Sequence, residues 1–408
     1  MKKVLAYGFP LAGNFGGPSV VHGLREAVRE FCPDAEFVCW DRGGLDPVVC
    51  GEMDFRVRRD PYFRHPAKLF RDYVATQWFG MTPRGADKRA FWADFKESDV
   101  VVNCYAISFH HKKDDRVHAH PFLAAIRRVL DFYGIGILAR LTGRLSVKST
   151  SSYGPMSTDY EKWLAKLSAR LAFDRFIARE MESADEFARV ASPRAPVPVA
   201  PDVGNLMPLG GAVEVVPGRV GIAVSFRIIR QWDGRAEDYI ACIAGLIGHV
   251  RTTYGCSVLL IPNQLTRSEG PNDAAIADMV LEKLHDRSDV GTFDAVANGP
   301  KALKRAIASC EVLVSSRYHA SVAGLSSGVP QLVIGWHRKY GELMDLYGQG
   351  EWMMATEEVS SASLCERFDS LWQDRASIRL QIKSRYGTVR KTVTDVLGDV
   401  FRKGNGNG

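Results

Sequence analysis

Several features that mark other classes of protein are missing from this 408-residue chain. It contains no run of about 18 apolar residues, so we expect no membrane-spanning helix. The amino-terminal stretch has neither a long apolar core nor a small-residue cleavage site, and we expect it to form the first strand. The net charge is only +6, which favours anionic small molecules or an anionic membrane surface and requires no nucleic acid.

The cysteines also lack a pattern. There are eight, scattered along the chain, and none belongs to a C-x-x-C pair. Several lie within predicted strands or helices, as buried free thiols do in a reducing compartment. We therefore expect a cytoplasmic protein.

The usual nucleotide and metal motifs are absent. No G-x-G-x-x-G or D-x-D string occurs, and the segment 147–150 resembles the end of a P-loop without its glycines. Four histidines cluster at His110, His111, His118 and His120. The lysines and arginine among them would repel a cation, so we favour an exposed loop over a zinc site. We expect no metal and no cofactor.

What the chain does contain is a repeated alternation of strand-like and helical patterns, which predicts an α/β protein with parallel sheets. Residues 1–200 and 218–403 each carry one such series, and the segment 201–217, rich in Pro, Gly and Val, is the predicted linker. The length suits two Rossmann-like domains. Residues 377–402 are predicted to form a C-terminal helix, and 404–408 a disordered tail.

The richest candidate site surrounds two predicted strands, 311–315 and 331–335. Arg317 and His319 lie where the first strand meets a helix, the usual ligand position in open α/β sheets. Lys339 follows the end of the second strand. Neighbouring strands lie ~4.8 Å apart, so these three side chains could reach one small anion. A buried structural role is the ordinary alternative for a histidine, but its place beside Arg317 favours function.

Three other segments follow predicted strands in the same way. Arg179 and Arg227 each come just after a strand, where guanidinium groups can bind a carboxylate or phosphate through two hydrogen bonds. The loop that begins with Gly13 and Asn14 joins a strand to a helix. It could cradle an anion with its backbone N–H groups or simply be a tight turn, and the sequence does not separate the two.

Basic and aromatic residues interleave between Phe55 and Trp78. Such a stretch can hold an anionic membrane surface or a glycolipid phosphate. A solvated face whose aromatic residues belong to the core is the interpretation we favour, because most charged runs are of that kind.

The order of residues in the candidate site resembles the polysaccharide pyruvyl transferase family. Arg317-Tyr-His319 is followed by small residues, by Gly328-Val-Pro330, by an apolar strand and by Lys339. Weaker matches lie along most of the chain, at Gly13-Asn14, Gly154-Pro155, Ala178-Arg179-Glu180, Asp202 and Val224 to Arg227.

The resemblance implies a GT-B arrangement, two Rossmann-like domains facing across a cleft, with the acceptor on the N-terminal side and phosphoenolpyruvate on the C-terminal side. It implies transfer of pyruvate, as a ketal, onto two hydroxyls of a sugar in a polysaccharide or glycolipid precursor, with release of phosphate. Arg179, Arg317 and Lys339 suit the anionic groups of phosphoenolpyruvate, and His319 suits general acid/base catalysis. Further substrate-binding candidates are Arg227, Gly13 and Asn14.

Two other functions remain open at this point. One is a GT-B glycosyltransferase, in which the arginines and the lysine of the second domain would bind the diphosphate of a nucleotide sugar. The other is a noncatalytic domain of the same fold that binds a sugar. The sequence names neither the acceptor sugar and its hydroxyl pair nor the ketal stereochemistry. It also leaves open the oligomeric state, whether the acceptor is lipid-linked, and whether the protein contacts the inner face of the membrane.

Overall fold

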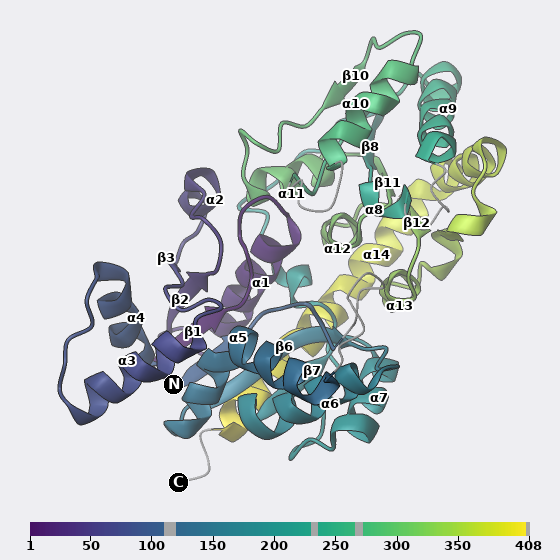
Figure 1. The fold of residues 1–408 in the computed structure, drawn as a ribbon. Helices are drawn as coiled ribbons and strands as arrows, with labels where there is room; N and C mark the ends of the chain where they lie inside the picture. Colours follow the sequence, from purple (N-terminus) through teal and green to yellow (C-terminus); the bar gives the residue numbers. More distant parts are fainter. Residues whose placement is uncertain (110–119, 230–235, 266–271, 405–408) are drawn as a thin grey trace.

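The structure is a computed structural model that describes residues 1–109, 120–229, 236–265 and 272–404. These residues form two parallel sheets, one in each half of the chain, with helices on their faces (Figure 1). The predicted α/β class is therefore confirmed. The predicted histidine cluster falls mostly outside the described residues, which exclude His110, His111 and His118.

The first sheet has the order β3-β2-β1-β4-β6-β5, and β7 also pairs with β6. Its strands are β1 (Lys3–Tyr7), β2 (Glu36–Asp41), β3 (Arg56–Arg59), β4 (Val100–Asn103), β5 (Ile107–Ser108), β6 (Leu145–Tyr153) and β7 (Arg175–Ala178). Its helices are α1 (Gly16–Phe31), α2 (Pro47–Gly51), α3 (Pro66–Trp78), α4 (Ala86–Glu97), α5 (Pro121–Leu141), α6 (Asp159–Leu167), the π-helical turn η1 (Ser168–Ala172) and α7 (Met181–Ala191). Helices cover both faces, which is why the central strands read as continuous apolar runs.

The second sheet has the order β10-β9-β8-β11-β12-β13. Its strands are β8 (Arg219–Ala223), β9 (Ser257–Leu260), β10 (Val290–Thr292), β11 (Val312–Ser315), β12 (Gln331–Gly335) and β13 (Met353–Ala355). Its helices are α8 (Phe226–Ile229), α9 (Ala236–Tyr254), α10 (Asp273–Lys283), α11 (Pro300–Ala308), α12 (Tyr318–Ser326), α13 (Lys339–Leu346) and the 3₁₀ turns η3 (Gly350–Trp352) and η4 (Thr356–Glu358). The strands on either side of α12, β11 and β12, run parallel as neighbours, which is the condition for a shared anion site at their ends.

In both sheets the strand that comes first in the sequence lies in the middle of the sheet. The first strand of each, β1 or β8, lies between two neighbours to which the chain connects in opposite directions. Such a switch point leaves a crevice outside the carboxyl ends of the strands, where ligands bind in open α/β sheets. The fold thus offers one such position in each half.

The segment predicted as a linker, 201–217, begins as packed structure. The 3₁₀ helix η2 (Val203–Leu206) is buried against α1. A Cβ on Gly23 of α1 would lie only 1.8 Å from the Val203 carbonyl oxygen, so the two backbones touch. The Pro, Gly and Val content that suggested a linker therefore partly reflects close packing of this segment against α1.

Helix α14 (Ser361–Gly404) contributes to both halves (Figure 1, yellow). Leu364 and Phe368 belong to the core of the second sheet, whereas Val393 and Leu397 belong to the core of the first. The predicted helix, 377–402, began too late, and we had placed all of it in the second domain. An apolar stripe shows that one face of a helix is buried but not against which core. Gly404 ends this helix, and the rest of the predicted tail lies outside the described residues.

The basic and aromatic stretch matches the solvated-face interpretation over most of its length. It contains the edge strand β3, in which Arg56 lies 3.2 Å from Glu36 and Arg58 lies 3.2 Å from Asp94. The charged composition does not reveal this strand, because one side of an edge strand faces solvent and needs no apolar alternation. Among the residues the structure describes, no helix has both the length and the apolar character to cross a bilayer.

Candidate active site

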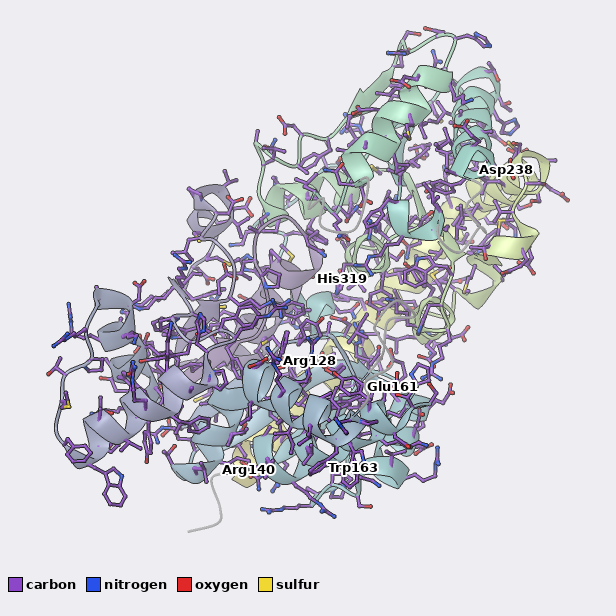
Figure 2. All side chains as sticks on the ribbon, viewed as in Figure 1. Arg128, Arg140, Glu161, Trp163, Asp238 and His319 are labelled. Atoms are coloured by element: carbon purple, nitrogen blue, oxygen red, sulfur yellow. The ribbon has the colours of Figure 1, made fainter. Side chains whose placement is uncertain are left out.

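The candidate residues of the second half lie at the switch point of its sheet. β11 is a buried apolar strand, and the chain turns at Ser316 into α12, which begins at Tyr318. The Ser315 hydroxyl oxygen accepts a hydrogen bond from the Arg317 N–H at 3.2 Å and so shapes this turn. Figure 2 shows His319 where the two halves of the molecule meet.

Arg317 is held within the second half. Its guanidinium forms an ion pair with Asp273, donates a hydrogen bond to Gln264 Oε1 at 3.2 Å and lies 5.2 Å from the centre of the Phe226 ring. Asp273 is fully buried and also accepts hydrogen bonds from backbone N–H groups after β8 and β9. The charge of Arg317 is thus already paired, and only its Nε is buried without a partner.

Arg179 comes from the first half, just after β7, and its side chain is 2 % exposed. It forms an ion pair with Asp202 and donates hydrogen bonds to Ala106 O at 3.0 Å and Ser152 Oγ at 2.8 Å. Burial alone lowers the pKa of Arg179, but nearby groups, Asp202 among them, raise it above its usual range. Its guanidinium also lies 5.1 Å from the ring centre of Tyr318, so it reaches the second half.

His319 lies between Asp202 and the amino-terminal end of α1. Its Nε2 is 3.6 Å from Asp202 Oδ2, too far for a hydrogen bond, and has no other partner. A Cβ on Gly16 would lie 2.6 Å from His319 Nδ1, so only glycine leaves room for the ring. Burial lowers the pKa of His319, and the cations of Arg179 and Lys339 add to this effect against the carboxylate of Asp202. The imidazole is therefore mainly neutral at pH 7.

Asp202 is the acidic group at the centre of the site. Burial raises its pKa, but Arg179 and His319 outweigh burial and hold the pKa below its usual range. Its second oxygen accepts a hydrogen bond from the Gly204 N–H at 2.8 Å, which fixes the carboxylate at the start of η2. We had noted Asp202 only as a match to the family and had placed it in the linker.

Lys339 is a buried cation without an anion. It begins α13, is 7 % exposed, and its Nζ lies 5.0 to 5.6 Å from the ring centres of Tyr318, Trp336 and Tyr340. Within the described ranges its ammonium group forms no hydrogen bond or ion pair. Burial lowers the pKa of Lys339 to about 7, and repulsion from Arg179 and Arg227 contributes. An incoming anion would stabilise the protonated form.

The structure brings Arg227 to the same region, beyond the end of a strand as expected. It lies in the short helix α8, beyond the end of β8, with its guanidinium 5.9 Å from the Phe226 ring centre. Its charge lowers the pKa of Lys339. Arg179, Arg227 and Lys339 therefore form a positive group that draws on both halves.

The loop at Gly13 and Asn14 joins the two halves. Gly13 O accepts a hydrogen bond from Leu265 N at 2.9 Å, and Phe15 N donates one to Asn263 O at 3.0 Å. Asn14 Oδ1 accepts the Gly16 N–H at 2.8 Å. Two of the N–H groups that could have cradled an anion are thus already bonded, and the loop holds the start of α1 beside His319.

Two glutamates near the site were not among our candidates. Glu180 Oε1 accepts a hydrogen bond from Ser152 Oγ at 2.6 Å, and its other oxygen is buried without a partner. Burial raises the pKa of Glu342 to about 7, and the negative charge of Glu180 contributes. Glu342 lies one helical turn after Lys339, so recognising α13 would have brought it to attention.

The site therefore combines paired and unpaired charges. Arg179 and Arg317 are neutralised by Asp202 and Asp273, whereas Lys339 has no counter-ion within residues 1–109, 120–229, 236–265 and 272–404. Within the part of the chain that the structure describes, no three His, Cys, Asp or Glu side chains are close enough to hold a metal. Its own side chains can bind an anion and move protons.

Solved structures with similar folds are glycosyltransferases and related proteins. Anabaena HepE in complex with UDP-glucose has a TM-score of 0.56 and 14% identity, covering 99% of both chains. A glycosyltransferase from Rickettsia africae has a TM-score of 0.55 and 9% identity, covering 100% of this chain and 99% of that one. The rhamnosyltransferase SpnG complexed with thymidine diphosphate has a TM-score of 0.50 and 11% identity, covering 95% and 96%. At such identities the likeness shows the fold alone, and it confirms the predicted GT-B arrangement.

At the level of sequence, no curated protein matches the chain. The family model described as polysaccharide pyruvyl transferase, however, matches residues 14–338. That range covers most of the chain and includes Asn14, Arg179, Asp202, Arg227, Arg317 and His319. The chain belongs to the polysaccharide pyruvyl transferase family.

Proposed function

We propose that this protein transfers pyruvate from phosphoenolpyruvate to two hydroxyls of a sugar, as a ketal, and releases phosphate. The observation that carries the proposal is Lys339, a buried cation that has no counter-ion among the described residues and lies near Arg179 and Arg227. Phosphoenolpyruvate carries a carboxylate and a phosphate, about 2.5 to 3 negative charges in all. The second half takes this donor, the first half takes the saccharide acceptor, and no further cofactor is needed.

In the proposed reaction, the oxygen of one hydroxyl bonds to the central carbon of phosphoenolpyruvate while the methylene carbon gains a proton and becomes a methyl group. The oxygen of a second hydroxyl then bonds to the same carbon, and phosphate leaves with the second proton. A neutral His319 suits removal of a hydroxyl proton. Lys339 suits donation to the methylene carbon, because a catalytic pKa near the working pH is the most effective.

The alternative is a glycosyltransferase that uses a nucleotide sugar. It is favoured by HepE, a protein of similar fold that was solved with UDP-glucose. The two functions differ in their donor, so a thermal-shift comparison separates them. Phosphoenolpyruvate should raise the melting temperature, and UDP-glucose should not. The opposite result would establish the alternative.

The decisive experiment incubates the protein with phosphoenolpyruvate and a panel of saccharides, and follows phosphate release and the mass of each sugar. We expect phosphate release to depend on a saccharide that gains a pyruvyl group. His319→Ala should lower turnover by about 10²–10⁴-fold and keep phosphoenolpyruvate binding. His285→Ala, at an exposed position, is the matched control. Full turnover by His319→Ala would remove this residue from the mechanism.

We also propose that the acceptor is lipid-linked and that the protein works at the cytoplasmic face of the membrane. In support, three large apolar side chains at the end of α3 and just beyond it are strongly exposed: Trp78 at 79 %, Phe79 at 73 % and Met81 at 60 %. Aromatic residues of this kind insert at lipid–water boundaries. The wild-type protein should co-sediment with anionic vesicles, and Trp78→Ser with Phe79→Ser should not. Equal sedimentation of the two proteins would contradict this role.

A further inference from the structure

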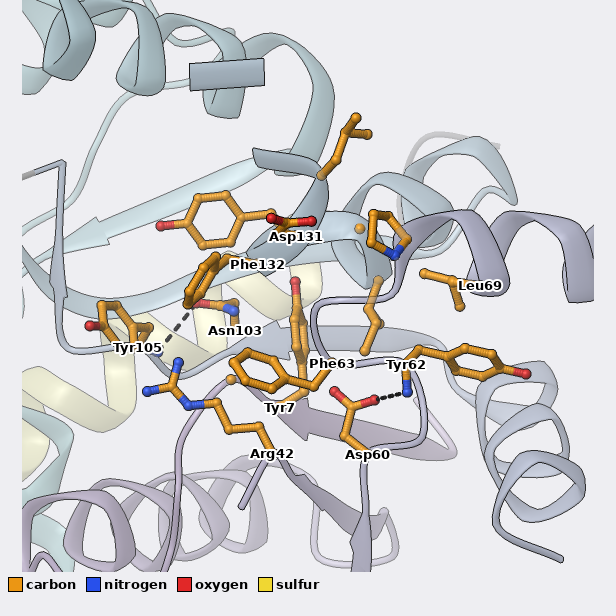
Figure 3. Close-up of a pocket in the computed structure, with 16 residues that line it drawn as sticks. Tyr7, Arg42, Asp60, Tyr62, Phe63, Leu69, Asn103, Tyr105, Asp131 and Phe132 are labelled. Carbon is orange, nitrogen blue, oxygen red and sulfur yellow. Dashed lines mark hydrogen bonds between the residues drawn. The ribbon is translucent and has the colours of Figure 1, made fainter. Parts of the chain in front are cut away.

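The first half contains a cavity that the reaction described above does not use. It lies outside the carboxyl ends of β1, β2 and β4, the switch point of the first sheet (Figure 3). We call it the Arg42 pocket. It is lined by Tyr7, Arg42, Asp60, Phe63, Asn103, Tyr105 and Phe132 among others.

Arg42 is the main charged group of this pocket. Its guanidinium lies 5.1 Å from the ring centre of Phe63, 5.0 Å from that of Tyr105 and 5.9 Å from that of Phe132. Figure 3 shows it directed toward Tyr105 and Phe132. No acidic side chain forms an ion pair with it in the described ranges. A cation enclosed by aromatic rings and lacking a carboxylate partner is a binding group for an anion.

Two more arginines increase the positive charge. Arg64 lies 5.3 Å from the ring centres of both Phe63 and Phe132, and Arg128 lies 3.6 Å from that of Phe132. Burial lowers the pKa of Arg42, and the charges of Arg128 and Arg64 lower it further against the Tyr105 hydroxyl. The three arginine side chains therefore place positive charge around the pocket at this end of the sheet.

The acidic residues of the pocket do not cancel this charge. Asp131 also lines the pocket, and its carboxylate is paired with Arg127 of the same helix at 3.7 Å. Asp60 accepts a hydrogen bond from the Tyr62 N–H at 2.8 Å, and burial raises its pKa to about 7, so it is only partly charged at neutral pH. An anion would thus meet a net positive environment.

The pocket adjoins the candidate active site through one segment. Tyr105 lines the pocket, and the next residue, Ala106, accepts a hydrogen bond from Arg179 at 3.0 Å. The carbonyl of Tyr105 also accepts a hydrogen bond from Ser151 Oγ at 2.8 Å. The pocket and the candidate active site therefore share the segment formed by Tyr105 and Ala106.

We propose that the Arg42 pocket binds an anionic group, a carboxylate or a phosphate, carried by the acceptor saccharide. Arg42 pairs with the anion, and the faces of Phe63, Tyr105 and Phe132 contact the sugar ring, as aromatic side chains do in small-molecule sites. The inference rests on the proposed function, since it assigns the acceptor to the first half. It makes a charged sugar the preferred substrate class.

The test is a calorimetric titration with matched pairs of neutral and anionic sugars: glucose with glucuronate, galactose with galacturonate, and each neutral sugar with its 1-phosphate. At least one anionic member should bind about 10- to 100-fold more tightly than its neutral partner, as expected for a charge-assisted hydrogen bond. The anionic sugar that binds more tightly, the uronate or the sugar phosphate, identifies the chemical group that carries the charge. No preference in any pair would overturn the proposal.

Arg42→Gln should abolish the preference and leave binding of the neutral sugar unchanged. Arg64→Gln, on an exposed side chain, should reduce it a few-fold and serves if Arg42→Gln folds poorly. Arg189→Gln, on the exposed surface of α7, is the control. A preference that survives both pocket variants would refute the assignment, as would inorganic phosphate that binds as tightly as the sugar phosphates.

Binding of phosphoenolpyruvate is measured with the same proteins. If the preference for anionic sugars depends on Arg42 but phosphoenolpyruvate does not bind, the proposed function is wrong and the assignment of the Arg42 pocket is kept. If phosphoenolpyruvate binds and pyruvate is transferred equally to neutral and anionic sugars, the pocket assignment fails and the function remains.

Discussion

At the scale of single residues, the difference between paired and unpaired cations decides what the site can bind. Arg179 and Arg317 each hold a buried aspartate, so their positions are fixed before any ligand arrives. Lys339 lies among three aromatic rings and is close to half-protonated at neutral pH. The arginines provide a rigid frame, and the lysine provides the charge that a ligand can still use.

Lys339→Met tests this role. Because the folded-state pKa of Lys339 is about 7 and the ordinary value is 10.5, the folded protein carries this charge fully only below pH 7. Phosphoenolpyruvate should bind the wild-type protein about 10- to 100-fold more tightly than Lys339→Met below pH 7. The ratio should shrink as pH rises through 7, since binding must then include proton uptake.

The measurement is calorimetry of both proteins between pH 6 and 8.5, where titration of the ligand affects them equally and cancels in the ratio. Lys283→Met, at an exposed position paired with Glu237, is the control and should show no change at any pH. A constant ratio would mean that Lys339 is not titrating. Without ligand, the same pKa predicts that the charge of Lys339 disfavours folding below pH 7, so its contribution to stability rises between pH 7 and 10.5.

At the scale of elements, the start of α1 and the start of α12 meet across the two halves. Gly16 lies against the His319 ring, and the loop before it is bonded to residues 263–265 of the second half. The amino-terminal end of α1 carries a partial positive charge, which favours a neutral imidazole beside it. The helix therefore limits the position of His319 and adds to the effect of burial on its charge.

Gly16→Ala should uncouple activity from stability. Alanine is a better helix residue than glycine, so the melting temperature should change little, but its Cβ would displace a ring that now lies 2.6 Å away. We expect turnover to fall by about 10- to 100-fold, as misplacement of a reacting group by an ångström can cost. Phosphate release and thermal melting measure the two effects. Gly44→Ala, with no atom within 4 Å, should leave both unchanged. Full activity in Gly16→Ala would show that the ring tolerates displacement.

At the scale of the whole molecule, α14 ties the two cores together. It begins against the second sheet and ends with Val393, Leu397, Val400 and Phe401 in the core of the first. The Arg390 side chain near its end is 2.8 Å from Glu30 of α1. Loss of this packing would leave the first core uncovered.

Two substitutions in the same helix test that role. Leu397→Ala removes a fully buried side chain from the first core and should lower the free energy of unfolding by about 2–5 kcal/mol. Leu380→Ala, at a side chain that is 70 % exposed, should cost no more than about 0.5 kcal/mol. Urea denaturation measures both. Equal costs would mean that the end of α14 does not stabilise the first half.

Much of this arrangement could be predicted because it depends on neighbours along the chain. The apolar run of β11, the turn at Ser316 and the small residues of α12 are local signals, and they placed Arg317 and His319 correctly at a strand end. Polar or exposed elements gave no such signal. The edge strand β3 was missed for this reason. The early part of α14 was missed although Leu364 and Phe368 are buried at helical spacing.

By itself, the sequence determined the two series of strands and helices and the cationic residues at strand ends, since periodicity and turn chemistry act over a few residues. Only the tertiary structure decided which charges are paired. Asp202 and Asp273 neutralise Arg179 and Arg317, and Lys339 finds no ion-pair partner in the part of the chain that the structure describes. Segments far apart in the chain form the Arg42 pocket. The physical reason is that burial and charge pairing depend on contacts between distant segments, and an apolar or charged pattern shows that a partner is needed without showing which one.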